Sequence, residues 1–255
     1  MHTTLDTQPA RPAAPVADHA RPNLYLPIHK ALRSFMMDTL FRIGQMDAAD
    51  EGDKAAALSQ LDSLLSFCAE HVEHENRFLH TAIEACEPGA AERTAGDHEE
   101  HIDSIDALRD EANALRRATD AAEQALLALR LYRHVALFVA DNFQHMHIEE
   151  TANAATLFRH YSDAQLAAIH ERLLATISPS GHLLTARWMM PAMNPAERAA
   201  AVNGMQMQMP PEALLGVLEH VRPHLDAPAW ERLQQVARAP RSVAPAGKAQ
   251  PGGSA

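Results

Sequence analysis

The sequence predicts an all-α protein, and three of its features favour that fold class. Hydrophobic residues make up 47% of the 255 residues, ample for a core, whereas aromatic residues make up only 5%. Alanine and leucine are abundant, glycine is sparse and runs of β-branched residues are absent, a composition typical of helices. Apolar residues recur at steps of three and four along several long segments, which is the spacing of one helix face.

Charge and cysteine content argue against several classes of partner and fold. The formal net charge is -11 and no basic stripe is present, so neither nucleic acid nor an anionic membrane is an expected partner. Cys68 and Cys86 do not make a disulfide framework. No segment has the roughly 18 apolar residues of a membrane span, and the first 23 residues lack the hydrophobic segment of a signal peptide. We therefore expect a cytoplasmic protein.

Composition divides the chain into four parts. Residues 1–23 are rich in proline and predict a disordered tail, and residues 240–255, rich in proline, glycine and alanine, predict another. Residues 24–178 hold the long amphipathic segments. A Ser-Pro-Ser-Gly break then separates them from residues 179–239, which predict a small helical appendage.

The first two helices are expected at about residues 25–46 and 54–85. His29 lies on the apolar stripe of the first, where a histidine alone is more often a core residue than a ligand. His71 and Glu75 lie on the stripe of the second. The apolar members of that second stripe are Leu58, Leu61, Leu65, Cys68, Val72, Phe78, Leu79 and Ile83.

The third helix is expected to follow a loop at residues 87–96, with Asp97 as its N-cap and its end near Arg117. His98 and His101 begin the apolar face of this helix. On this boundary His98 lies in the first turn, where helix ends fray unless something holds them.

The fourth helix, about residues 121–161, carries His145 and Glu149 on its apolar stripe. These two residues repeat the H-x-x-x-E spacing of the second helix. Their neighbours His147 and Glu150 point elsewhere on a regular helix, so we expect both on the solvated surface.

Beyond the fourth helix, Ser162 and Gln165 predict a capping box for a shorter fifth helix that ends near Ile177. Three further helices are expected in the appendage, which is rich in methionine. Thioethers are soft ligands that suit copper(I), but packing at helix contacts is the favoured interpretation. The methionines concerned are Met189, Met190, Met193, Met205, Met207 and Met209.

The repeated H-x-x-x-E spacing predicts metal binding. Residues four apart project from one helix face about a turn from each other, and an unpaired carboxylate in a core is costly. A metal ion bound by both side chains removes that cost. Histidines on the facing stripes of the other two helices supply further ligands, which predicts two metal ions in a helical bundle. Imidazole and carboxylate ligands without thiolate favour iron and allow manganese or zinc.

Residues 25–177 resemble a hemerythrin-like, or HHE cation-binding, domain of the bacterial type with a helical C-terminal extension. The matching segments are IHKALR, EHVEHENRFLHTAIE, DHEEHIDSIDAL and QHMHIEE. The resemblance implies an antiparallel up-down four-helix bundle around two non-haem iron ions, bridged by both carboxylates and by an oxo or hydroxo group. The candidate metal ligands are His29, His71, Glu75, His98, His101, His145 and Glu149.

Two departures from oxygen-carrying hemerythrins affect these expectations. The third helix has H-x-x-H in place of H-x-x-x-H, which leaves open whether His98, His101 or both are ligands. The fourth helix has H-x-x-x-E in place of H-x-x-x-x-D. Both differences resemble the broader bacterial group and weigh against a simple oxygen carrier.

The favoured function is binding of oxygen or nitric oxide at a di-iron centre, for sensing, storage or stress response. In this hypothesis the appendage relays the state of the centre or forms a homodimer contact. One alternative is an enzyme that acts on nitric oxide or peroxide, or that supplies iron for repair of iron–sulfur clusters. Another is plain iron handling and storage. No separate catalytic acid, base or nucleophile stands out, although His74 or His134 could relay protons.

Overall fold

The computed structural model describes Arg21 and residues 23–239, and every regular element among these residues is a helix. The predicted all-α fold class is therefore confirmed. None of the helices in the described part of the chain is both long and apolar enough to cross a membrane.

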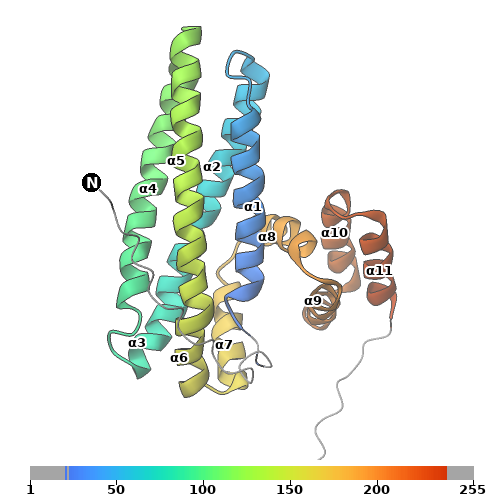
Figure 1. The fold of residues 1–255 in the computed structure, drawn as a ribbon. Coiled ribbons are helices and arrows are strands. Elements are labelled where there is room, and N and C mark those ends of the chain that lie inside the picture. The colour runs from blue at the N-terminus through green and yellow to red at the C-terminus, as the bar shows by residue number, and fades with distance from the viewer. Residues whose placement is uncertain (1–20, 22, 240–255) are drawn as a thin grey trace, which may run out of the picture. The chain divides into compact units, whose positions relative to one another are not determined.

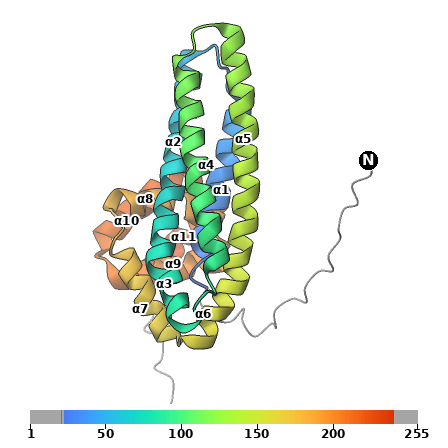
Figure 2. The same ribbon diagram turned by 90° about the vertical axis from the view of Figure 1, so that its left-hand side faces the viewer.

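The chain forms two compact units. Of the described residues, one unit contains those up to His29 and residues 35–176, and the other contains residues 30–34 and 177–239. In the first unit the long helices lie side by side (Figures 1 and 2), and α4 packs against both α2 and α5. These long helices are α1 (Leu26–Gln45), α2 (Glu51–His74), α4 (Glu92–Arg117) and α5 (Ala121–Ile148).

Both H-x-x-x-E helices continue through a π-helical segment that begins at the glutamate. The backbone N–H of Glu75 reaches two carbonyl oxygens of the preceding turn, and so does the N–H of Glu149. π-Helical segments within α-helices are rare and occur frequently at functional sites. The segments are Glu75–His80, followed by α3 (Thr81–Cys86), and Glu149–Asn153, followed by α6 (Ala154–His160).

Polar caps fix several helix ends, one of them as the sequence predicts. The Asp120 side chain accepts a hydrogen bond from the N–H of Glu123 at the start of α5. Ser162 and Gln165 form the expected capping box at α7 (Asp163–Leu174). These caps supply acceptors to N–H groups that have no partner within the helix.

The predicted start of the third helix is wrong. Helix α4 begins at Glu92, not after Asp97, because the Glu84 carboxylate of α3 accepts hydrogen bonds from the N–H groups of Gly89 and Ala91. Gly89 has a positive φ of 86°, which allows the tight turn between α3 and α4. The N-terminus of α4 is thus stabilised by a residue from the preceding helix.

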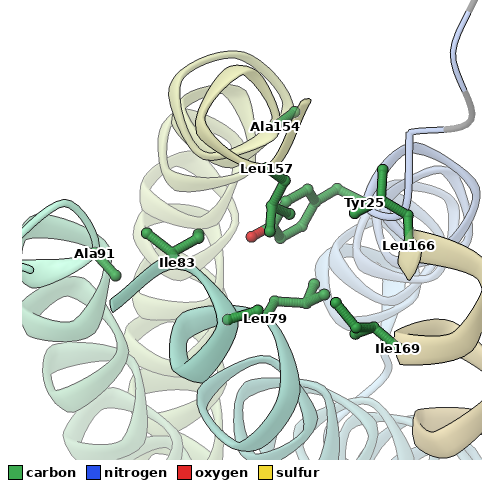
Figure 3. Packing of buried hydrophobic residues seen from close by; sticks show 9 residues of the cluster. Tyr25, Leu79, Ile83, Ala91, Ala154, Leu157, Leu166 and Ile169 are labelled. Atoms are coloured by element: carbon green, nitrogen blue, oxygen red, sulfur yellow. The ribbon is translucent and has the colours of Figure 1, made fainter. Parts of the chain in front are cut away.

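A hydrophobic cluster closes one end of this unit. Figure 3 shows side chains from α3, α6, α7 and the start of α1 converging there. Leu166 and Ile169 place α7 against the other helices. The buried members are Tyr25, Leu79, Ala82, Ile83, Ala91, Ala154, Leu157, Leu166 and Ile169.

The second unit has its own apolar core. Met190 and Met193 are buried in it, Met189, Met205 and Met209 pack against it, and Met207 is 76% exposed. This placement supports packing as the role of most of these methionines. The helices are α8 (Pro179–Ala192), α9 (Pro195–Gln208), α10 (Pro211–Val221) and α11 (Ala227–Arg238), with a 3₁₀ turn at Arg222–His224.

The predicted tails, residues 1–23 and 240–255, lie outside the described residues except for Arg21 and Asn23. Arg21 is held against the first unit, contrary to the predicted disorder at that position. Its guanidinium donates to Asp163 Oδ1 at 2.8 Å and to the carbonyl oxygen of Tyr161 at 2.7 Å.

Candidate metal centre

The structure brings six of the seven predicted ligands together as two groups that could each hold a metal ion. The two groups share Glu75 and Glu149, and in each group the candidate ligand atoms lie within 4.8 Å of one another. The first group is completed by His29 and His71, and the second by His98 and His145.

The two glutamates are buried, and their carboxylates make no hydrogen bond of good geometry with any described residue. Glu75 is 2% exposed and Glu149 is fully buried. Within the described part of the chain, their four carboxylate oxygens and the Nε2 atoms of His29 and His71 all lack a well-formed hydrogen bond. Buried polar atoms without partners are costly. A cation between these atoms would remove that cost, so the donor set fits a metal ion.

The spacing of the ligand atoms also fits metal coordination. His71 Nε2 lies 3.2 Å from Glu75 Oε1, and His145 Nε2 lies 3.1 Å from Glu149 Oε2. The Nε2 atoms of His98 and His145 are 2.9 Å apart. An ion with bonds of about 2.0–2.2 Å places neighbouring ligand atoms about 2.8–3.6 Å apart, according to its coordination number. All three distances fall within that interval.

His29 and His98 each face both carboxylates. His29 Nε2 is 3.4 Å from an oxygen of Glu75 and 3.4 Å from an oxygen of Glu149. The corresponding distances from His98 Nε2 are 3.3 Å and 3.6 Å. Each of these histidines can therefore ligate an ion that both glutamates also hold.

The contacts between the histidines and the two glutamates shift the pKa values of both. Burial lowers the pKa of His29, but its contacts with glutamates outweigh burial and raise the pKa to about 10. Burial also lowers the pKa of His98, but its contacts with Glu149 and Glu75 outweigh burial and raise the pKa to about 9. Burial raises the pKa of Glu75 and of Glu149, yet the surrounding histidines bring both below the ordinary value. Both glutamates are therefore held as carboxylates, the form that binds cations.

Three of the histidines are also oriented through their second ring nitrogen. His29 Nδ1 lies 3.0 Å from Glu150 Oε1, and His98 Nδ1 lies 2.7 Å from Asn76 Oδ1. His145 Nδ1 lies 3.2 Å from Asp97 Oδ2. A histidine that donates from Nδ1 points Nε2 to the opposite side, here toward the glutamates. This pairing is the usual outer arrangement of a metal-binding histidine.

These contacts correct three expectations. Glu150 was expected at the solvated surface, but it contacts His29 because α1 covers that side of the π-helical segment. Asp97 does not cap a helix; it lies within α4 and contacts His145. His98 lies nearly two turns inside α4, so it is not in a fraying first turn.

His101 is the predicted ligand that lies outside both groups. It is 5% exposed, and its ring centroid is 4.8 Å from that of His145. Burial lowers its pKa to about 4, with further lowering by the positive charge of the neighbouring histidines. His101 as an additional ligand stays a prediction.

His80 lies beside the candidate metal centre, although the sequence pattern assigns it no role. Its Nε2 lies 3.7 Å from Glu149 Oε1, and its ring stacks on that of His98 with centroids 4.7 Å apart. On a regular α-helix, the residues three and four positions after Glu75 share its face. In the π-helical segment the residue five positions after Glu75, which is His80, lies on that face instead. The π-helical segment is therefore the signal that locates His80, and the sequence spacing does not show it.

The remaining histidines considered for the site lie elsewhere. His134, considered as a proton relay, is exposed and contacts Glu111 at 2.7 Å. His147 is exposed, as expected, and His74 is half-buried. Neither belongs to the two groups of candidate ligands.

The comparisons with known proteins do not add to this description. Protein-family models, curated proteins and solved structures all gave no match to the chain. The geometry of the candidate metal centre therefore carries the functional conclusion.

Proposed function

We propose that this chain is a hemerythrin-like di-iron protein that binds a small diatomic ligand, oxygen or nitric oxide. In this proposal α1, α2, α4 and α5 form an antiparallel up-down four-helix bundle, and the two ligand groups hold one iron ion each. The C-terminal unit then serves sensing or a homodimer contact.

The observation that carries the proposal is the sharing of both glutamates by two groups of imidazoles. A centre that holds one metal ion needs only one group of imidazoles. A structural ion pair between a histidine and a glutamate needs only one carboxylate. Paired carboxylates from helices are a common means of holding two neighbouring ions in a bundle. The donor set of imidazole and carboxylate without thiolate suits iron, with manganese or zinc as alternatives.

Bound iron would supply electrons to a diatomic ligand, and the residues of the chain would control access and orientation. The two glutamates and the imidazoles fix the positions of the ions. The surrounding buried side chains exclude water, which protects a reactive ligand from hydrolysis and proton leakage. The buried apolar residues on the same helices include Val72, Leu79 and Phe138.

The proposal is tested by metal analysis and optical spectroscopy of the full chain. We expect two iron ions per chain after anaerobic loading with ferrous iron. Exposure to oxygen should then produce a visible absorption band that is lost on return to anaerobic conditions. Zinc or manganese at the same stoichiometry would contradict the assignment of iron, and an irreversible spectral change would favour the enzymatic alternative.

The contact between Asp97 and His145 gives a further prediction. Asp97→Asn keeps the size of the side chain but removes the charge that orients the imidazole. We expect about a 10- to 100-fold loss of metal affinity with the fold preserved, as for other outer partners of metal-binding histidines. Competition with a chromophoric chelator measures the affinity. Asp103→Asn, an exposed position on the same helix, is the matched control, and equal affinity for both variants would contradict the role of Asp97.

A further inference from the structure

The Tyr25 hydroxyl is buried beside the candidate metal centre, and its proton has no acceptor among the described residues. Tyr25 is fully buried, and its hydroxyl makes no hydrogen bond of good geometry within the described part of the chain. Figure 3 shows its ring reaching from the start of α1 toward Leu157, with the oxygen directed into the interior. A buried tyrosine hydroxyl usually finds a partner, and leaving one unpaired is unfavourable. A phenylalanine would pack there without that penalty.

Tyr25 adjoins the ligands of the centre. Its ring centroid lies 5.6 Å from that of His29. Burial raises the pKa of Tyr25 well above its ordinary value, and the negative charges of Glu149 and Glu75 raise it further. The hydroxyl therefore lies within the electrostatic reach of both shared carboxylates.

A small polar cluster adjoins Glu149. His80 Nε2 is 3.2 Å from Thr94 Oγ1, and Asn153 Nδ2 donates to the same oxygen at 3.1 Å. All three side chains are buried, and Nδ1 of His80 has no partner. The Asn153 side chain approaches the Tyr25 hydroxyl as a hydrogen-bond donor and opposes the rise of its pKa. The Tyr25 hydroxyl proton, which lacks an acceptor, and the unpaired His80 Nδ1 therefore occur in one buried polar region next to Glu149.

We propose that this region receives the exogenous ligand of the centre and that the Tyr25 hydroxyl donates a hydrogen bond to it. The ligand class is a small molecule or anion with an acceptor atom, such as oxygen, nitric oxide or azide. This inference rests on the proposed function, since it assigns a residue that retains the ligand at the same centre. Tyr25 is a specificity-determining residue in this scheme, and it is not needed for metal binding.

The test compares Tyr25→Phe with the wild-type chain and with Tyr161→Phe. Tyr161 is a matched control because its hydroxyl donates to the carbonyl oxygen of Ala82 at 2.9 Å, and it belongs to neither ligand group. Iron content is measured first, and azide is then titrated into the air-oxidised, iron-loaded proteins by optical spectroscopy. We expect equal iron content in all three proteins and about a 10-fold weaker affinity for azide in Tyr25→Phe alone, since azide is charged.

Thermal unfolding of the metal-free proteins provides a readout that does not depend on iron. Tyr25→Phe should leave Tm unchanged or raise it, because the hydroxyl makes no hydrogen bond of good geometry with the described residues. Tyr161→Phe should lower Tm by about 2–4 °C, because it loses the bond to the Ala82 carbonyl and the weaker bond from the Cys86 thiol. A lower Tm for metal-free Tyr25→Phe would show a structural role for the hydroxyl and overturn the inference.

The remaining outcomes separate the two proposals. Wild-type azide affinity in Tyr25→Phe, or loss of iron from that variant, would overturn the role of Tyr25 and leave the di-iron proposal standing. A wild-type chain that takes up no iron, or that binds iron but no azide, would refute the proposed function and this inference together. The wild-type measurement therefore decides the first proposal, and the comparison of variants decides the second.

Discussion

Glu149→Gln is expected to abolish binding of both metal ions, and Glu75→Gln is expected to do the same. Each glutamate belongs to both ligand groups, so one substitution removes a ligand from two ions. Glutamine preserves the volume at these buried positions but lacks the second anionic oxygen that sharing requires. We expect a loss of affinity of more than about 100-fold, since even an outer partner contributes about 10- to 100-fold.

Metal analysis after loading and desalting measures this effect. Glu73→Gln is the matched control for Glu75→Gln, because Glu73 is exposed two residues earlier on α2. His147→Ala is the control for α5, where His147 is exposed beside the candidate ligands. Both controls should retain full metal content. A Glu75→Gln or Glu149→Gln variant that keeps two ions would show that the carboxylates are not shared ligands.

The helices of this chain were largely predictable because local signals determine them. The first helix was expected at about residues 25–46 and is found at Leu26–Gln45. The capping box of Ser162 and Gln165 is found where it was expected. Apolar stripes and side-chain caps act over a few residues, so the sequence alone reveals them.

The start of α4 was not predictable in the same way. Asp97 has the residue type and position of an N-cap, but the turn is fixed by Glu84, which lies on another helix. Asp97 instead contacts His145 on α5. Tertiary contacts determine both the start of α4 and the partner of Asp97. A local sequence pattern does not reveal such contacts.

The candidate ligands were predictable from spacing, whereas their surroundings were not. Four-residue spacing holds within α2 and α5 up to Glu75 and Glu149, where regular helix geometry still applies. Beyond each glutamate the π-helical segment changes the direction of the side chains, which places His80 beside Glu149. Glu150 contacts His29 of α1, and only the packing of helices shows this.

Removing the metal is expected to lower the thermal stability of the first unit and to leave that of the second unchanged. Both ligand groups lie in the first unit. A ligand that binds only the folded state at about 1,000 times its Kd stabilises that state by about 4 kcal/mol. For a unit of this size about 1 kcal/mol corresponds to about 2–4 °C, so chelation should lower its Tm by roughly 8–16 °C.

The chain contains a built-in means of separating the two transitions. Its two tryptophans, Trp188 and Trp230, both lie in the second unit. Tryptophan fluorescence therefore follows the second unit, while far-UV circular dichroism follows the helices of both. We expect a chelator to shift the circular dichroism transition and not the fluorescence transition.

The Glu149→Gln variant makes this expectation specific to the proposed centre. If the chelator acts by removing ions from the two ligand groups, a variant that cannot hold them should unfold at the same temperature with and without it. A chelator effect that persists in Glu149→Gln would place the metal elsewhere in the chain. A fluorescence transition that shifts together with the circular dichroism transition would show that the two units unfold cooperatively, because the ligand groups contain no residue of the second unit.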